Sequence, residues 1–131
     1  GAAGGMGFGM IAFFNCPLQL GIDGLLDIID FESILAGADL VLTGEGRIDP
    51  QSMRGKTVIG VARRASKCGV PTISVVGDIA DGIESAYDLG VSAIFSINRV
   101  AMERKLIKLR AKSDMEATVE NIIRAVKAVK L

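Results

Sequence analysis

The sequence predicts an α/β protein with a parallel sheet, and three observations carry this prediction. Half of the 131 residues are apolar but only 5% are aromatic, so aliphatic side chains must build the core. From residue 39 onward, short β-branched runs alternate with amphipathic segments, which is typical of βαβ units. The length is that of one domain that can bury a core of its own.

Three short apolar runs are predicted as strands. They cover residues 40–42, 72–76 and 93–97, and each is mostly apolar, as strands covered on both faces are. Open α/β domains usually carry about four to six strands. We therefore expect the chain to be a piece of a longer protein.

Helices are predicted between and after these strands. Aliphatic residues at helical spacing predict a helix over 57–68, which Gly69 ends. A second helix is expected over 81–90. Ser113 and Glu116 form a capping box, which predicts that the terminal helix opens there.

The region before residue 39 follows a different pattern. A glycine-rich entry leads into an apolar helix over about 6–14, a loop around Pro17, and two short helical pieces that end near Gly37. None of these segments supplies an obvious strand for the sheet.

The charge balance argues against a nucleic-acid or membrane-surface binder. Fifteen basic side chains match fifteen acidic ones, so the chain has no strong uniform field. Residues 99–112 carry a net charge of +5, which we interpret as a solvated helix face. No apolar run reaches the roughly 20 residues of a membrane span, and the sequence begins without the layout of a signal peptide.

Residue types that are rare or absent narrow the chemistry further. The chain has no His, which excludes an imidazole base and the Ser/His and Cys/His nucleophile systems. Proton transfer must fall to a carboxylate, a lysine or water. Cys16 and Cys68 lack metal-site spacing and predict a reducing, cytoplasmic compartment with no zinc.

The stretch from Thr43 to Lys56 is the predicted functional site, a charged glycine-rich loop that leaves the first strand. Ligands bind at the carboxyl ends of strands in open α/β sheets, and this loop follows such an end. Gly44 and Gly46 would let the backbone approach a ligand, and the helix that begins near Thr57 would point its N–H groups at an anion.

The charged side chains of this loop suit phosphate chemistry. Arg47, Arg54 and Lys56 could contact phosphate oxygens, while Glu45 and Asp49 could hold Mg²⁺ or accept a proton. An ordinary βα turn with a solvated Glu–Arg pair is the alternative. Five charged residues between two short elements favour the functional interpretation.

Two familiar phosphate motifs do not fit. Gly55-Lys56-Thr57 resembles the end of a Walker A loop, but Pro50 stands where its first glycine is required. The opening Gly-rich run has Met10 in place of the third glycine of G-x-G-x-x-G, and it follows no strand.

Residues 38–62, ADLVLTGEGRIDPQSMRGKTVIGVA, resemble the signature of the glycerate kinases of the glycerate 2-kinase type. Further segments resemble the same family in order: residues 2–9, 21–23, 69–71, 95–97 and 118–122. The resemblance covers essentially the whole chain. Val58 departs from it, because many members have Pro at this position of the first helical turn.

The resemblance implies a fold and an activity. The activity is ATP-dependent phosphorylation of D-glycerate with Mg²⁺, which gives 2-phosphoglycerate or 3-phosphoglycerate. The fold is a Rossmann-like or flavodoxin-like three-layer parallel sheet, split in the sequence around an inserted domain. Residues 1–37 would be the end of that inserted domain with connecting helices, and residues 38–131 the C-terminal part of the Rossmann-like domain.

The resemblance also assigns roles to residues. Asp49 is the expected base at the glycerate hydroxyl and Glu45 the expected Mg²⁺ contact, although the two could be exchanged. Arg47 and Lys56 would stabilise phosphates or clamp the glycerate carboxylate. The positions expected to bind substrate or nucleotide are Thr43, Gly44, Gly46, Gln51, Gly55, Gly4, Gly5 and Gly7; for the last three, close helix packing is an equal alternative.

Three functions remain open from the sequence. The first is a kinase fragment that carries part of an active site and is inactive alone; the second is a non-catalytic phosphate-binding or assembly module. A flavodoxin-like receiver or cofactor domain is the third, and the basic loop speaks against it. With few strands, an exposed sheet edge predicts self-association or a homo-oligomer.

Overall fold

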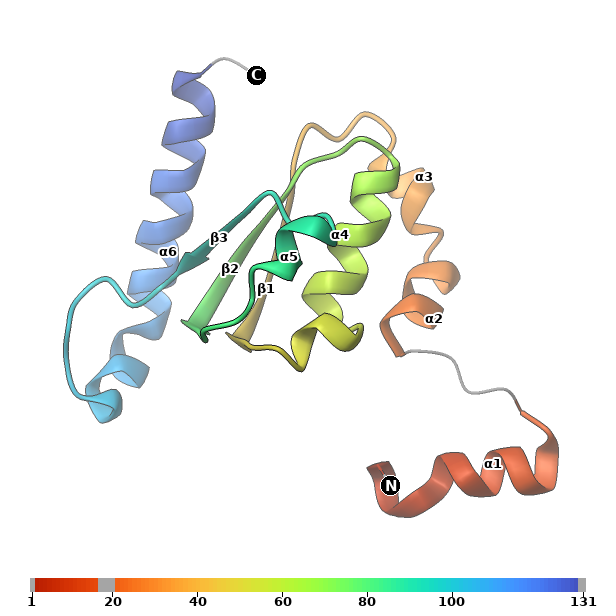
Figure 1. Ribbon diagram of the computed structural model, residues 1–131. Helices are drawn as coiled ribbons and strands as arrows, with labels where there is room; N and C mark the ends of the chain where they lie inside the picture. The colour runs from red at the N-terminus through yellow and green to blue at the C-terminus, as the bar shows by residue number, and fades with distance from the viewer. Residues whose placement is uncertain (1, 17–20, 130–131) are drawn as a thin grey trace.

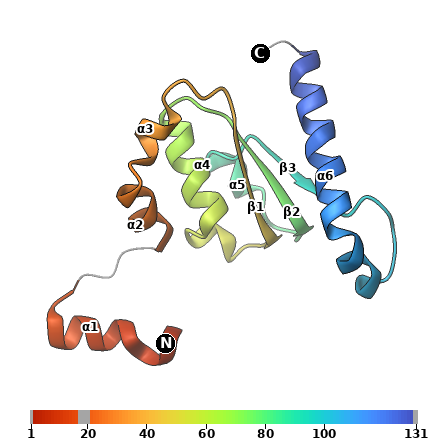
Figure 2. The same ribbon diagram turned by 180° about the vertical axis from the view of Figure 1, so that it is seen from behind.

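A computed structural model describes residues 2–16 and 21–129 (Figure 1). Three parallel strands form the sheet in the order β1-β2-β3: β1 (Val41–Ile48), β2 (Thr72–Ile79) and β3 (Ala93–Ser96). Helix α4 (Thr57–Lys67) covers one face and α6 (Arg104–Ala128) lies against the other (Figures 1 and 2). The predicted α/β class is confirmed, and the arrangement is consistent with a Rossmann-like fold.

The central strand β2 is covered on both faces and contributes to two clusters of side chains. On β2, Val76 packs toward α4 with Ile48 and Ile59, whereas Val75 packs toward α6 with Ile97 and Ile122. This alternation is what a strand between two helical layers requires.

The helices before the sheet follow the sequence prediction. They are η1 (Ala2–Gly5), α1 (Met6–Phe14), α2 (Gly21–Ile28) and α3 (Phe31–Leu35). The predicted loop at Pro17 lies outside the described residues. No residue of α1 is buried, and both views show this helix apart from the sheet (Figures 1 and 2). The assignment of residues 1–37 to an inserted domain stays a prediction.

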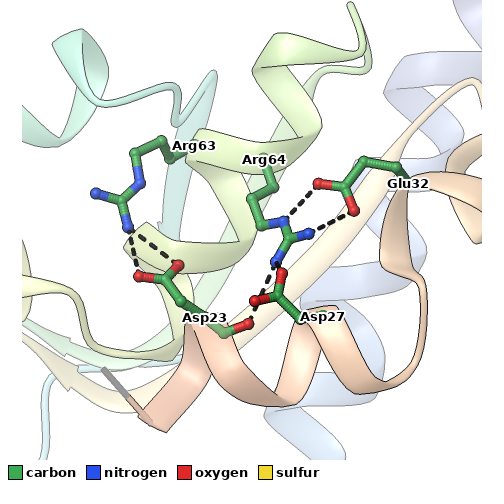
Figure 3. A network of polar contacts seen from close by, with 5 residues as sticks. All are labelled: Asp23, Asp27, Glu32, Arg63 and Arg64. Carbon is green, nitrogen blue, oxygen red and sulfur yellow. Dashed lines mark hydrogen bonds and ion pairs between the residues drawn. The ribbon is translucent and has the colours of Figure 1, made fainter. Parts of the chain in front are cut away.

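Helices α2 and α3 pack on the outer side of α4, and an ion-pair network joins them (Figure 3). Both oxygens of Asp23 accept hydrogen bonds from Arg63, at 3.1 Å each. Arg64 donates to both oxygens of Glu32 and to Asp27, at 2.5 Å each. The hydrogen bonds from Arg64 lower the pKa of the Glu32 carboxyl group.

The first strand is longer than predicted, which corrects the description of the site. Residues 43–47 belong to β1, and only residues 49–56 form the connection to α4, which includes the short helix η2 (Ser52–Arg54). Hydrogen bonding between β1 and β2, in register from Val41 with Thr72 to Ile48 with Ile79, holds this segment extended. Pairing therefore overrides the poor strand propensity of its glycines and charges.

The helix boundaries after β2 also differ from the prediction. Helix α6 begins at Arg104, so Ser113 lies inside it and does not cap it. The Ser113 hydroxyl donates instead to the carbonyl of Arg110, a local bond that serine can make within a helix. Helix α5 (Ser85–Asp88) is a single turn, shorter than the predicted 81–90. Among the described residues, no helix is long and apolar enough to cross a membrane.

Candidate active site

A cleft of about 900 Å³ opens on the α6 face of the sheet. Its walls are β1, β2, the residues that follow β3, and α6 with the connection that leads into it. The lining residues are Leu42, Thr43, Gly44, Glu45, Gly46, Val75, Gly77, Asp78, Ile97, Asn98, Met102, Ile107, Lys108, Ala111, Met115 and Val119. A mostly apolar cleft of this size with a few polar groups is typical of a small-molecule site.

Glu45 is the lining residue with an unsatisfied side-chain oxygen. Its Oε1 is fully buried and has no hydrogen-bond partner among the described residues. A buried acceptor without a partner costs free energy, so in native proteins such atoms usually meet a ligand or water. The Glu45 carboxylate therefore has hydrogen-bonding capacity that the described residues do not fill.

Asp78 and Asn98 stand at the ends of the two neighbouring strands. The Asn98 amide donates to Asp78 Oδ1 and to the carbonyl of Gly77, both at 2.8 Å. The Ser96 hydroxyl donates to the same carbonyl at 3.0 Å and accepts the Asn98 N–H at 3.0 Å. These bonds hold the Asp78 carboxylate at the strand-end wall of the cleft.

The β1–α4 connection is organised by Asp49. Asp49 and Ser52 bond reciprocally: the N–H of Asp49 donates to Ser52 Oγ at 3.2 Å, and the N–H of Ser52 donates to Asp49 Oδ1 at 3.0 Å. Lys56 Nζ lies 3.5 Å from the same oxygen. Burial raises the pKa of Asp49, but the Ser52 N–H and the Lys56 charge outweigh this effect and hold the pKa below its ordinary value.

The structure divides the predicted site residues into three groups. Thr43, Gly44, Glu45 and Gly46 line the cleft. Asp49, Gln51, Gly55 and Lys56 lie in the connection before α4, outside the cleft lining, and Arg47 pairs in register with Asp78 near the end of β1. Gly4, Gly5 and Gly7 belong to η1 and the start of α1.

Two strand-end residues were missed by the sequence prediction, and so was one on α6. Asp78 and Asn98 directly follow apolar strand runs, so the rule that ligands bind at carboxyl ends could have found them. Lys108 could not have been found in this way, because it follows no strand and residues 99–112 were interpreted as a solvated helix face.

Two carboxylates in the cleft, Glu45 and Asp78, bear on the predicted Mg²⁺. The described residues contain no group of three or more His, Cys, Asp or Glu side chains that could hold a metal ion by themselves. Magnesium in nucleotide sites usually takes one or two carboxylates and completes its shell with phosphates and water. The donors present fit a metal that arrives with a phosphate ligand.

Known proteins resemble this chain along nearly its whole length. A sequence model of the Glycerate kinase family matches residues 1–127. The Glycerate kinase of Bacillus subtilis (strain 168) is 42% identical over 130 residues, which are 99% of this chain and 34% of the relative. The Glycerate 2-kinase of Escherichia coli (strain K12) is 41% identical over 97 residues, 74% of this chain and 26% of the relative.

The chain thus spans about a third of the length of the curated relatives it matches. The match runs through the strand segment that lines the cleft and continues along α6. The chain belongs to the glycerate kinase family.

Proposed function

We propose that this chain carries part of the active site for ATP-dependent phosphorylation of D-glycerate to 2-phosphoglycerate or 3-phosphoglycerate. The observation that carries the proposal is the cleft beside the parallel strands, whose lining includes Glu45, a residue with a buried Oε1 that has no hydrogen-bond partner among the described residues. The names of the relatives support glycerate as the substrate.

Glu45, with Asp78 beside it in the lining, would hold Mg²⁺ in this cleft. When bound, the ion neutralises charge on the phosphate oxygens during transfer. The Asn98 amide keeps the Asp78 carboxylate at the cleft wall. Gly46 has open space where a side chain would start, so a ligand could approach its backbone closely.

The connection before α4 and the end of β1 would supply the proton acceptor and the positive charges that the reaction needs. Asp49 has a lowered pKa and is therefore ionised at neutral pH, as an acceptor for the glycerate hydroxyl proton must be. Lys56 and Arg47 would stabilise the transferred phosphate or clamp the carboxylate. These residues lie outside the cleft lining, so the proposal places glycerate between the cleft and this connection.

A chimera tests the proposal with the remaining two thirds of a relative in place. The matching 130 residues of the Bacillus subtilis Glycerate kinase are replaced by this chain, and ADP release is measured with MgATP and D-glycerate. We expect turnover, and we expect Glu45→Gln and Asp49→Asn to reduce kcat by roughly a hundredfold or more. Glu116→Gln, an exposed change on α6, is the matched control.

Two further measurements complete the test: identification of the phosphorylated product, and the activity of the isolated chain. Phosphorus–proton correlation NMR distinguishes phosphate on carbon 2 from phosphate on carbon 3. We expect the 131-residue chain alone to give no turnover above that of its Glu45→Gln variant. Turnover by the isolated chain would contradict the view that it holds only part of a site.

A non-catalytic phosphate-binding or assembly module is the second candidate, favoured by the short span of the chain against its relatives. It predicts that the isolated chain binds MgATP while the chimera stays inactive despite being folded. An active chimera that loses turnover in Glu45→Gln excludes it.

A further inference from the structure

Lys108 brings a positive charge into the cleft from α6. Of the cleft-lining residues that the structure describes, it is the one cation. It forms no ion pair within the described chain, whereas Arg110 and Arg124 on the same helix pair with Asp114 and Glu120. Lys108 and Lys112 are both exposed, as a solvated helix face requires, but only Lys108 is among the residues that line the cleft.

The cleft is therefore bipolar. Its strand wall includes the acidic residues Glu45 and Asp78, and its helical wall includes Lys108 among apolar residues such as Ile107 and Met115. A ligand that fits both walls needs an anionic group toward α6, together with a hydroxyl or a bound cation toward the strand ends.

We propose that Lys108 is an oxyanion-binding residue of this cleft, which contacts a phosphate or a carboxylate of the bound ligand. The choice of MgATP and glycerate as ligands rests on the proposed function. The contact itself rests on the placement of Lys108 in a ligand-sized cavity. A larger acidic partner, such as an acidic peptide, fits less well because Glu45 and Asp78 would repel it.

Isothermal titration of the 131-residue chain tests this contact with three probes: MgATP, D-glycerate and pyrophosphate. The variant is Lys108→Met, which keeps the apolar stem of the side chain and removes the charge. Lys112→Met is the matched control, because it removes the same charge one helical turn away and outside the cleft lining. Lys108→Arg is the conservative variant.

We expect Lys108→Met to weaken binding roughly ten- to hundredfold, as the loss of a charged hydrogen bond does, and to reduce its dependence on salt. Lys112→Met should leave both unchanged, and Lys108→Arg should restore most of the affinity. A loss confined to MgATP identifies a phosphate as the bound group, and a loss confined to D-glycerate identifies the carboxylate.

Equal affinities for the wild type and Lys108→Met, or equal losses in Lys108→Met and Lys112→Met, would overturn the inference. Lys108-dependent binding of pyrophosphate without binding of MgATP or glycerate would support the lysine contact and count against the proposed function. Binding of MgATP or glycerate with equal affinity in the wild type and Lys108→Met would support the proposed function and count against the lysine contact. Absence of binding to all three probes would overturn the inference about Lys108, whereas the proposed function would still be decided by the chimera.

Discussion

Three glycines in the site segment and its partner strand have different physical roles. A Cβ added at Gly44 would lie 2.2 Å from the carbonyl oxygen of Val75, and one at Gly77 would lie 2.3 Å from the carbonyl oxygen of Gly46. These two glycines let the backbones of β1 and β2 approach closely. Gly46 itself has nothing within 4 Å of its Cβ position, so strand packing does not require it.

This difference predicts that alanine substitutions at Gly44 and Gly46 change the free energy of unfolding by very different amounts. Gly44→Ala should lower the free energy of unfolding by roughly 3 kcal/mol or more, because the added methyl group meets a strand carbonyl that cannot move freely. Gly46→Ala should change it by less than about 1 kcal/mol. Urea denaturation followed by circular dichroism measures both. Equal loss in the two variants would show that the close approach at Gly44 is not what demands glycine.

The same residues explain why the sequence misplaced the end of β1. Glycine and charged residues are depleted in strands, so local propensity marks residues 43–47 as a loop. Their extended conformation depends on hydrogen bonds to β2, a partner 31 residues away in the sequence. No local pattern reports that pairing.

Elements with strong local signals were predicted well. The helix over 57–68 was placed to within one residue, because its apolar stripe and Gly69 both mark it. The start of α6 was wrong because the capping-box pattern at Ser113 also occurs inside a helix. Lys108 was missed for a different reason: its segment was interpreted as a solvated helix face, because charge alone does not show which side of a helix faces a cleft. The strand wall of the cleft was partly predicted.

The contact of α2 and α3 with α4 depends on charge, which makes it sensitive to acid. Arg64 lowers the pKa of Glu32, so the carboxylate stabilises the folded state above its ordinary pKa of about 4.5. That contribution is lost as pH falls through the lowered folded-state pKa. The outer helices should therefore loosen in acid before the sheet does.

Hydrogen exchange between pH 7 and pH 3 tests this expectation. At pH 7 we expect faster amide exchange in α2 and α3 for Glu32→Gln than for the wild type, with the difference closing as pH falls through the lowered folded-state pKa of Glu32. Glu120→Gln, which removes an exposed pair on α6, is the control and should leave α2 and α3 unaffected. A difference that persists unchanged at pH 3 would mean that the Arg64 contact does not depend on the charge of Glu32.

At the scale of the molecule, two apolar surfaces lie open in the part of the chain that the structure describes. Strand β1 is an edge of the sheet, and its Leu42 side chain is 42% exposed. Helix α1 exposes large apolar side chains on every side, including Phe8 and Phe13. Contiguous apolar surface and an unpaired strand edge both favour association.

These surfaces predict that the 131-residue chain associates with itself through the edge of β1. Sedimentation velocity should show a weight-average coefficient that rises with concentration. Leu42→Lys should reduce that rise, because a charge on an edge strand opposes strand-to-strand pairing.

Phe13→Lys, which places the same charge on α1, separates the two surfaces: if it alone abolishes association, then α1 and not the sheet edge drives it. A single monomeric species up to millimolar concentration would contradict the prediction, and it would mean that both apolar surfaces remain exposed without driving association.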